Sequence, residues 1–580
     1  MRLRKISIKH FRNLRNIDIY PSHTTIFVGE NNIGKSNLLY ALRLLLDPAA
    51  KRLEAELSEE DINDAARSEG DNSFSIAIEV GDLQNHVELE AIFRERLDRE
   101  EDETYVTLEG IYEPDDEGTY NWKVQVLPPE GRNNDPQQFS PRMARSIPLY
   151  YLDAVRDAKT EMRATGRGAL SQLLSGLELE DVEDEVIEGI SSANEAISRN
   201  QGIYDLSTGI RDLLSANIPG GQAEASMSVA TEDPSQLVKN LRLNLKCQSD
   251  SRAYEMDRHG TGLQNLVLIA MFRHRISTGG YIQPILAIEE PEAHLHPQAQ
   301  RCLFSDLNSI DGPVLLTTHS SAIVESSEPL GIVRLTRNQQ NEVTAHQLDP
   351  AKIDENDLKL LARMMRSGRA DAFFARAIIV VEGPSEVVAL PAFAEQIGSN
   401  LDREGVSVVP VDGNSFSYIL HACCVDHFSI PSMVTFDTDV LETDNNLVVE
   451  AYKAGLISAE DRDACRHGSA EYRQRKLEEI GWIPAVHNFE EEITKIGYLP
   501  LILQVINEAG FTPSLDDFTT TNGLQKDAQG VSKYINEARS GKSLKVPIAR
   551  TVANAVKNVH NVPDCYKKSI EKAVSLAIGS

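Results

Sequence analysis

The order of apolar and polar residues near the start of the chain predicts a hairpin, a core strand and a helix. Residues 3–9 and 17–20 alternate between apolar and polar, as half-buried strands do. A β-branched run from Thr24 to Val28 then leads directly into Gly29. After this glycine, leucines at helical spacing predict a helix that Asp47-Pro48 ends; they are Leu38, Leu39, Leu42, Leu45 and Leu46.

Further along the chain, the same patterns predict a multidomain α/β protein. Strands are expected at 74–80, 104–112, 120–127, 284–288 and 312–317, and residues from about 170 to 245 are mostly helical, as in a helical insertion. Residues 352–369 resemble a helical connector. Three more apolar runs, at 377–381, 406–411 and 433–436, predict a second, smaller α/β domain. The chain is therefore expected to divide into five segments, with boundaries at 1–165, 166–250, 251–348, 349–374 and 375–580.

Length and composition narrow the class of protein. A chain of 580 residues exceeds one compact core, so two to four domains are expected. No apolar run approaches the roughly 20 residues that a membrane span needs, and the first residues alternate like a strand. We therefore expect a soluble, cytoplasmic protein with no membrane partner.

Net charge and charge distribution point in different directions. The formal net charge of −30 argues against a nucleic-acid partner, because a phosphate backbone is bound by local Lys and Arg. Two stretches are nevertheless basic, and they are either ordinary helix surfaces or guides for a polyanion. The first comprises Lys359, Arg363, Arg366, Arg369 and Arg376; the second comprises Lys542, Lys545, Arg550, Lys557, Lys567, Lys568 and Lys572.

The first chemical motif is a phosphate-binding loop. Residues 29–36 read G-E-N-N-I-G-K-S, which fits G-x-x-x-x-G-K-S between a predicted strand and a predicted helix. In such a loop the backbone N–H groups surround the phosphates, the lysine reaches the β- and γ-phosphates, and the serine binds magnesium. The nucleotide-binding residues predicted here are Gly29, Asn31, Asn32, Gly34, Lys35, Ser36 and Asn37.

Two later strand ends carry residues that complete an ATPase site. The run Ile285–Ile288 ends in Glu289-Glu290-Pro-Glu, at the sheet edge where open α/β folds bind ligands. Glu289 is expected to support magnesium, and Glu290 to orient or deprotonate the attacking water. The run ending at Thr317 is followed by His319, which is expected to contact the γ-phosphate.

A glycine-rich turn precedes the helix expected at 265–272. It reads H-G-T-G-L-Q over residues 259–264, and Gly260, Gly262 and Gln264 are candidates for a second phosphate contact; the alternative is an ordinary helix cap. The order of P-loop, glycine-rich turn, Glu-Glu-Pro-Glu and Thr-His-Ser resembles the ATPase heads of the ABC, SMC and RecF families. In those heads the turn of one subunit closes over ATP held by another, so the resemblance implies at least a homodimer. The turn departs from the usual Ser-Gly-Gly form at Thr261.

A second chemical set is acidic. Glu382 follows the apolar run 377–381, and Glu386 lies four residues later; Asp437 and Asp439 follow the run 433–436. Residues i and i+2 at a strand end project to one side, and clustered carboxylates repel each other unless a cation neutralises them. The pattern therefore favours one or two Mg²⁺ or Mn²⁺ ions activating water at a phosphodiester.

This second set resembles a Toprim domain, and a head ATPase followed by Toprim resembles the OLD (overcoming lysogenization defect) family of ATP-dependent endonucleases. The Toprim resemblance implies a later acidic strand edge within residues 486–493, where Glu490 is the first choice and Glu492 the second. The OLD resemblance implies a nuclease lysine near the carboxyl end, either Lys545 or Lys542. Residues 29–47 and 377–386 look most like the A subunit of Gabija anti-phage defence.

The resemblance implies an ATP-regulated, metal-dependent DNA endonuclease of bacterial immunity that forms a homodimer or tetramer. A Gabija assignment implies a UvrD-like helicase partner. A retron assignment implies a reverse transcriptase and its DNA-RNA product. A protein of another class, an ATP-dependent DNA-binding clamp or scaffold that does not cut, is the alternative. The sequence leaves open whether ATP activates or restrains cleavage.

Overall fold

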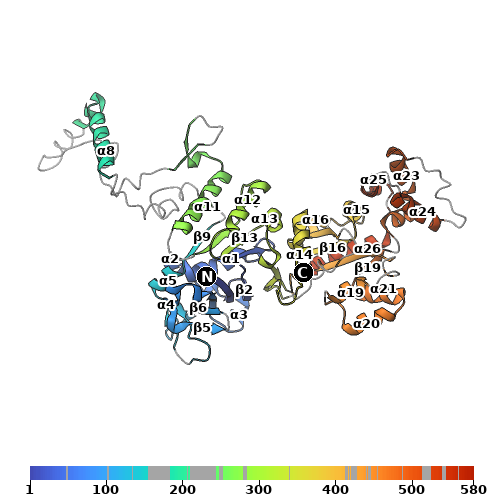
Figure 1. Ribbon diagram of the computed structural model, residues 1–580, viewed down its shortest axis with the longest axis horizontal. Helices are drawn as coiled ribbons and strands as arrows, with labels where there is room; N and C mark the ends of the chain where they lie inside the picture. Colours follow the sequence, from blue (N-terminus) through green and yellow to red (C-terminus); the bar gives the residue numbers. More distant parts are fainter. Residues whose placement is uncertain are drawn as a thin grey trace. The chain divides into compact units, whose positions relative to one another are not determined.

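The fold is known from a computed structural model (Figure 1). It describes residues 1–580 except 48–49, 101–102, 133–134, 154–182, 206, 209–242, 247–251, 279–283, 339, 412–415, 417–418, 420–422, 424–426, 439–440, 442–445, 454, 486–487, 512–523, 538–543, 560 and 580. The chain divides into two compact units. The first contains residues 1–151, 284–290 and 297–580, and the second contains 152–283 and 291–296. The five domain divisions expected from the sequence stay predictions.

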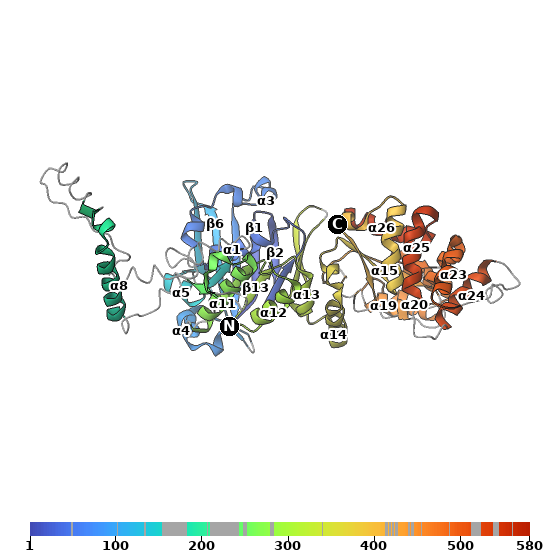
Figure 2. The same ribbon diagram turned by 90° about the horizontal axis from the view of Figure 1, so that it is seen from above.

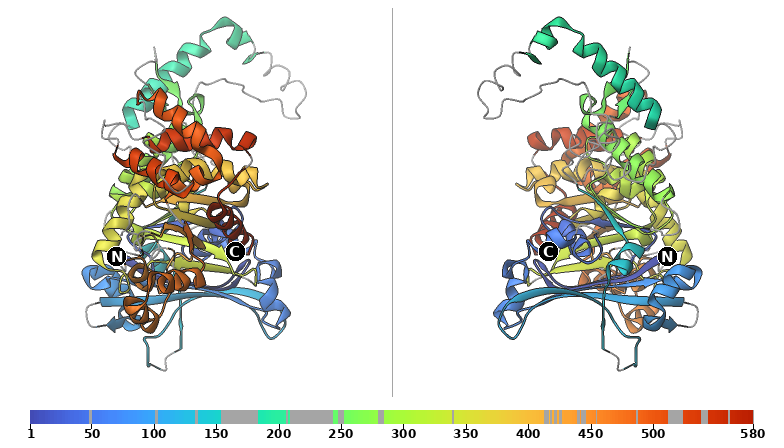
Figure 3. Two further views of the ribbon diagram at one scale, coloured as in Figure 1. Left: turned by 90° about the vertical axis from the view of Figure 1, so that its right-hand side faces the viewer. Right: turned by 90° about the vertical axis from the view of Figure 1, so that its left-hand side faces the viewer.

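An antiparallel sheet forms one layer of the first unit, and its strands are blue in Figure 3. Its order is β2-β1-β4-β6-β7-β8, and β5 pairs with β6. The alternation of β4 places Ile76 and Ile78 in the core, beneath the helix α1. The strands are β1 (Arg2–Phe11), β2 (Leu14–Ile19), β4 (Phe74–Gly81), β5 (Asp98–Glu100), β6 (Glu103–Pro114), β7 (Tyr120–Val126) and β8 (Gln137–Gln138).

A second sheet of the same unit carries the P-loop. Its order is β15-β14-β3-β13-β12-β9, and β3 runs parallel to both β13 and β14. β3 and β12 are buried along their whole length, which explains their unbroken apolar runs. The strands are β3 (Thr24–Val28), β9 (Leu149–Leu152), β12 (Ile285–Glu289), β13 (Val314–Thr317), β14 (Ile332–Arg337) and β15 (Val343–Gln347).

Helices cover these sheets, and the helix predicted after Gly29 is confirmed. α1 runs from Lys35 to Leu46 and buries the predicted leucines, and it ends at its C-cap, Asp47. The other α-helices of this part are α2 (Ala50–Glu54), α3 (Asp64–Ser68), α4 (Val87–Phe93), α5 (Pro141–Ser146), α12 (Pro297–Asn308) and α13 (Ser321–Ser326).

The predicted connector is helical only in part. α14 runs from Glu355 to Met364, and a π-helical turn at Met365–Arg369 follows it. Within that turn Ser367 and Gly368 leave helical geometry, because Gly368 takes the left-handed conformation at φ 82°. A short 3₁₀ helix, Ala370–Phe373, then leads toward β16. The single helix expected over 352–369 is therefore broken at its glycine.

The carboxyl-terminal part holds a parallel sheet of order β17-β16-β18-β19. Its strands are β16 (Ala377–Val381), β17 (Val406–Pro410), β18 (Ser432–Asp437) and β19 (Ile483–Ala485), so the three apolar runs form strands as predicted. α15 and α25 lie side by side, as Figure 2 shows. The helices are α15 (Pro384–Gln396), α16 (Leu401–Glu404), α19 (Asn446–Lys453), α20 (Ala459–His467), α21 (Ala470–Glu479), α22 (Phe489–Ile493), α23 (Leu499–Glu508), α24 (Leu524–Glu537), α25 (Lys545–Val559) and α26 (Asp564–Gly579).

A buried arginine ties strand β14 to the carboxyl-terminal part. Arg334 donates hydrogen bonds to the carbonyl oxygens of Phe373 (3.3 Å), Ala375 (2.8 Å), Phe428 (3.1 Å) and Ser429 (2.9 Å). Burial lowers the pKa of its guanidinium to about 10, so the group still carries its charge at neutral pH. A buried charge with four acceptors fixes β14 to the segments that precede β16 and β18.

The second unit contains the glycine-rich turn. Its described elements are α8 (Glu183–Ser198), the two-stranded pair β10 (Asn244–Leu245) and β11 (Tyr254–Glu255), and α11 (Thr261–Thr278). Helical structure is confirmed at α8, whereas most of the predicted insertion lies outside the described residues. Across the described part of both units, none of the helices is long and apolar enough to pass through a membrane.

Candidate nucleotide and metal sites

The P-loop follows β3 and is held open by its two glycines. Gly29 has φ 149° and Gly34 has φ 113°, so both lie in the region that favours glycine. A Cβ on Gly29 would stand 2.6 Å from the carbonyl oxygen of Leu335, and a Cβ on Gly34 would stand 2.8 Å from the side chain of Asn13. Neither position accepts a larger residue without a shift of its surroundings.

Lys35 is buried at the mouth of this loop. Its Nζ donates hydrogen bonds to the carbonyl oxygens of Gly29 (2.9 Å) and Glu30 (2.8 Å). The ammonium group is therefore held by the loop itself. In P-loop proteins this lysine reaches the β- and γ-phosphates, so bound nucleotide would compete with the two carbonyls for it.

The two predicted magnesium-binding residues of this site meet in the structure. The hydroxyl of Ser36 donates to Oε2 of Glu289 at 3.2 Å, and Tyr151 donates to Oε1 of the same carboxylate at 2.8 Å. Both oxygens of the buried Glu289 thus have partners. No sequence motif marks Tyr151, because it lies on β9, far from the P-loop in the chain.

Glu290 and His319 also come together. Nε2 of His319 lies 4.0 Å from Oε1 of Glu290, and both side chains are partly exposed. Burial lowers the pKa of His319, Lys35 lowers it further, and Glu290 opposes the shift. Glu290 has φ 41°, a strained conformation for a residue with a Cβ, which is frequent at functional sites.

The asparagines of the loop differ in their surroundings. Asn31 and Asn32 are exposed. Asn37 instead donates to Oδ1 of Asn13 at 2.8 Å and accepts from Arg12 at 2.9 Å. Asn13 in turn donates to the carbonyl oxygen of Ile33 at 2.9 Å. Asn37 therefore connects α1 to the β1–β2 turn, and its role toward nucleotide stays a prediction.

The glycine-rich turn opens α11 in the second unit. Gln264 donates to the carbonyl oxygens of His259 (2.8 Å) and Met256 (3.1 Å), so its side chain closes the turn. A Cβ on Gly262 would stand 2.5 Å from the carbonyl oxygen of His294. Gly260 has open space around its Cβ position. The contact of Gly260, Gly262 and Gln264 with nucleotide stays a prediction.

The second candidate site, which we name the acidic centre, consists of Glu382, Glu386, Asp437 and Glu490. Glu382 follows β16, and Asp437 ends the neighbouring parallel strand β18. The backbone N–H of Asp437 donates to Oε1 of Glu382 at 3.0 Å, so the two strand ends are in direct contact. Glu386 is buried in the first turn of α15.

Glu490 reaches the same centre from a helix. The later acidic segment was expected at a strand edge, but β19 ends at Ala485 and Glu490 lies in the first turn of α22. Glu490, the first choice for this position, acts electrostatically on Glu386. The second choice, Glu492, has Nζ of Lys495 at 3.6 Å from its carboxylate. Lys545, the first residue of α25, acts on both Glu386 and Glu490. Asp439 and Lys542 lie outside the described residues.

The chemistry of these groups suits a divalent cation. Burial, Glu490 and Glu382 raise the pKa of Glu386 to about 8, and burial raises that of Glu490 as well. Oε1 of Glu490 is buried without a hydrogen-bond partner among the described residues. No three His, Cys, Asp or Glu side chains in the described ranges stand in metal-ligand geometry. Mutually repelling carboxylates, one of which has an oxygen without a described partner, are what a cation would stabilise.

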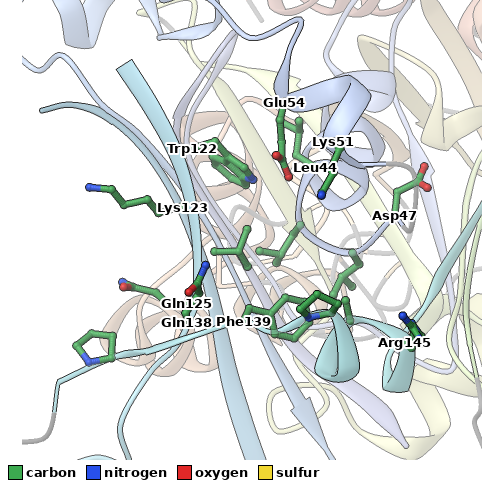
Figure 4. Close-up of a pocket in the computed structure, with 16 residues that line it drawn as sticks. Leu44, Asp47, Lys51, Glu54, Trp122, Lys123, Gln125, Gln138, Phe139 and Arg145 are labelled. Atoms are coloured by element: carbon green, nitrogen blue, oxygen red, sulfur yellow. The ribbon is translucent and has the colours of Figure 1, made fainter. Parts of the chain in front are cut away.

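A separate cavity is lined by residues that belong neither to the nucleotide site nor to the acidic centre. It measures about 940 Å³ and is lined by the end of α1, by Trp122 and by Phe139 (Figure 4). The charged lining residues that Figure 4 labels are Asp47, Lys51, Glu54, Lys123 and Arg145. None of its described lining residues belongs to the P-loop or to the acidic centre.

The fold and the two sites define a P-loop ATPase joined to a Toprim domain. Residues 24–325, more than half of the chain, match the family described as "AAA domain, putative AbiEii toxin, Type IV TA system", and the chain belongs to this family. Residues 373–439 match the "Overcoming lysogenization defect protein-like, TOPRIM domain". Together the two domains imply, in general terms, the use of a nucleotide and a divalent metal.

Curated relatives extend over most of the chain. The "OLD nuclease" of Thermus scotoductus is 26% identical over 459 residues, which cover 76% of this chain and 83% of the relative. The "Endonuclease GajA" of Bacillus cereus is 21% identical over 488 residues, with 80% and 78% covered. The "Uncharacterized protein YbjD" of Escherichia coli is 24% identical over 440 residues, with 70% and 75% covered. The predicted resemblance to OLD and Gabija proteins is confirmed.

The raised pKa of Glu386 predicts a pH-dependent stability in the metal-free protein. The folded state keeps a proton that the unfolded chain releases near the ordinary pKa of glutamate, so this stabilisation is complete at low pH. It is lost as the pH rises through about 8. Between about pH 5 and about pH 9, wild type should lose a few kcal/mol of unfolding free energy relative to Glu386→Gln. Urea unfolding in the presence of a chelator measures this difference.

The exposed Glu571, changed to Gln, is the matched control and should follow the wild-type pH profile. If wild type and Glu386→Gln changed in parallel across this range, Glu386 would not hold a proton in the folded protein.

Proposed function

We propose that this protein is a DNA endonuclease of bacterial anti-phage defence, dependent on a divalent metal ion and regulated by ATP. The observation that carries the proposal is the acidic centre, where Glu382 and Asp437 meet at the carboxyl ends of two parallel strands and the buried Glu490 acts electrostatically on the buried Glu386. The names of the relatives, which include an OLD nuclease and a Gabija endonuclease, support the substrate class.

We assign different roles to the residues in and around the acidic centre. Glu382, Glu386, Asp437 and Glu490 would hold one or two Mg²⁺ or Mn²⁺ ions, which supply an activated water and neutralise the phosphodiester oxygens when bound. Asp439 and Glu492 remain further candidates. Lys545 lies near Glu386 and Glu490 and would stabilise the negative charge that develops on the phosphate.

The ATPase site would act as a regulator. Ser36 and Glu289 would hold magnesium, Lys35 and the loop would hold the phosphates, and Glu290 and His319 would face the γ-phosphate. We propose a homo-oligomer, in which the turn containing Gly260 and Gly262 contacts nucleotide held by another subunit. A helicase of the UvrD type is the partner we favour, because a Gabija endonuclease is among the relatives.

A surface ion pair offers a route between the two sites. Arg376, which directly precedes β16, pairs with the side chain of Glu30 in the P-loop, and its Nη2 lies 3.3 Å from Oε2. The carbonyl of Glu30 is one of the two that hold Lys35. Nucleotide that draws Lys35 away would therefore disturb Glu30, and with it the strand that leads into Glu382.

The surroundings of this ion pair allow it to break and form again, and they give it little weight in the stability of the fold. Both side chains are about half exposed, at 49% for Arg376 and 44% for Glu30, so the pair contributes no more than about 1 kcal/mol to stability. A cavity of about 450 Å³ lies beside it, lined by Gly29, Glu30 and the segment 373–376. Space and a weak contact allow the loop to change its conformation.

Removing a metal-holding carboxylate should abolish cleavage. Loss of a residue that only orients a metal ligand typically costs 10- to 100-fold, so Glu382→Ala or Asp437→Ala should reduce cleavage by more than about 100-fold. Plasmid cleavage with Mg²⁺ or Mn²⁺ measures this, and Glu395→Ala, on the exposed face of α15, is the control. Cleavage that persists in both variants would place the nuclease site elsewhere. No cleavage by wild type under any condition would favour the non-cutting scaffold.

Breaking the ion pair should weaken the nucleotide response while leaving cleavage itself intact. We expect Arg376→Gln to cut DNA at the wild-type rate without ATP, and to respond to ATP much less than wild type does. Coupling between sites commonly amounts to about 5- to 150-fold, and this ratio should move toward unity. The ratio of cleavage rates with and without ATP is the measurement, and Lys35→Ala supplies the uncoupled reference.

The matched control is Arg366→Gln, which breaks a similar exposed pair, with Glu328 at 3.0 Å. It should retain the wild-type ratio. The proposed route is wrong if Arg376→Gln keeps the full ATP response while Lys35→Ala loses it.

A further inference from the structure

Tyr566 is a buried tyrosine whose hydroxyl has no hydrogen-bond partner among the described residues. The side chain is 0% exposed, and its oxygen makes no hydrogen bond with any described residue. Buried tyrosine hydroxyls nearly always find a partner, because an unpaired polar group in the core costs free energy. Phenylalanine would fill the same space without that cost. The hydroxyl therefore calls for an acceptor that comes within hydrogen-bond reach in another state of the protein.

The helix that carries Tyr566 is fixed beside the acidic centre. Tyr566 lies in the first turn of α26. One turn later, Ser569 forms a buried hydrogen bond of 2.8 Å with Thr435, which lies two residues before Asp437 on β18. The start of α26 is thereby anchored to the strand that ends in a predicted metal ligand.

Two aromatic rings hold the ring of Tyr566, and both come from elements that carry the acids. Phe393 of α15 stacks against it with the ring centres 6.0 Å apart, and Phe489 of α22 lies at 5.9 Å. Glu386 lies on the first of these helices, and Glu490 directly follows Phe489 on the second. A ring held in this way has little freedom to turn its hydroxyl elsewhere.

The carboxylates of the acidic centre act electrostatically on the hydroxyl of Tyr566. Burial raises the pKa of Tyr566 well above its usual value, and Glu386, Cys565, Asp437 and Glu490 raise it further. The phenol therefore keeps its proton at neutral pH and remains a donor. Its complete burial also means that it cannot touch DNA, so any role must act through another group.

We propose that Tyr566 is a positioning residue, whose hydroxyl donates a hydrogen bond to the carboxylates of the acidic centre, Glu386 first, when they hold a divalent cation. This inference rests on the metal site of the proposed function. A hydrogen bond from outside a metal site orients the ligand and raises metal affinity, and loss of such a partner typically costs 10- to 100-fold. Tyr566 would thus offset part of the repulsion among the carboxylates.

Binding of Mn²⁺ alone tests the inference without any cleavage assay. By titration calorimetry, Tyr566→Phe should bind Mn²⁺ about 10- to 100-fold more weakly than wild type. Its thermal unfolding midpoint in chelator should equal or exceed that of wild type, because the metal-free protein loses an unpaired hydroxyl. In cleavage, the Mn²⁺ concentration for half-maximal rate should rise at an unchanged KM for DNA.

Tyr498 supplies a matched control from the same domain. It is equally buried, but its hydroxyl donates to the carbonyl oxygen of Asn561 at 2.9 Å. Tyr498→Phe should therefore lower the unfolding midpoint in chelator and leave the affinity for Mn²⁺ unchanged. The two substitutions remove the same atom and are expected to have opposite effects.

The variant Glu382→Ala distinguishes a failure of the proposed metal site from a failure of the proposed role of Tyr566. If Glu382→Ala binds Mn²⁺ as tightly as wild type, the metal site itself is misassigned and the role of Tyr566 falls with it. If Glu382→Ala loses binding while Tyr566→Phe keeps wild-type affinity, the metal site stands and only the role of Tyr566 is refuted.

Discussion

Parallel strands bring their carboxyl ends to one edge of a sheet, and both candidate sites in this chain depend on that constraint. In the first sheet, β3, β12 and β13 deliver the P-loop, Glu289 and His319 to neighbouring positions. In the second, β16 and β18 bring Glu382 and Asp437 into contact. Residues more than fifty positions apart thus become neighbours without any long-range motif in the sequence.

The two sites differ in how their charges are satisfied. Glu289 has a hydroxyl partner on each oxygen, so both oxygens of this carboxylate are hydrogen-bonded before nucleotide binds. In the acidic centre, Glu386 has a raised pKa and Glu490 keeps a buried oxygen without a described partner. Unpaired buried carboxylates cost stability, and folded proteins seldom retain them without a compensating ligand. This contrast is the physical basis for placing a cation at the second site.

Local patterns in the sequence predict much of this architecture. The P-loop, the buried strands and the first acidic residues are each specified by a few adjacent positions, and the structure has them where the pattern puts them. Tyr151, Asn13 and Tyr566 carry no local signal, because the observed partners of the first two and the proposed partner of Tyr566 lie more than twenty positions away. The break at Gly368 depends on one glycine adopting a left-handed conformation, which a helical pattern does not exclude. Glu490 acts electrostatically on Glu386 from the first turn of a helix, whereas the Toprim resemblance implies a strand edge there, and its role stays a prediction.

The central claim is that four carboxylates form one divalent-metal centre, and anomalous scattering tests it most directly. Crystals of the full chain soaked with Mn²⁺ should show an anomalous peak enclosed by Glu382, Glu386, Asp437 and Glu490. Manganese bound only at Ser36 and Glu289, with no peak among these four residues, would contradict the claim.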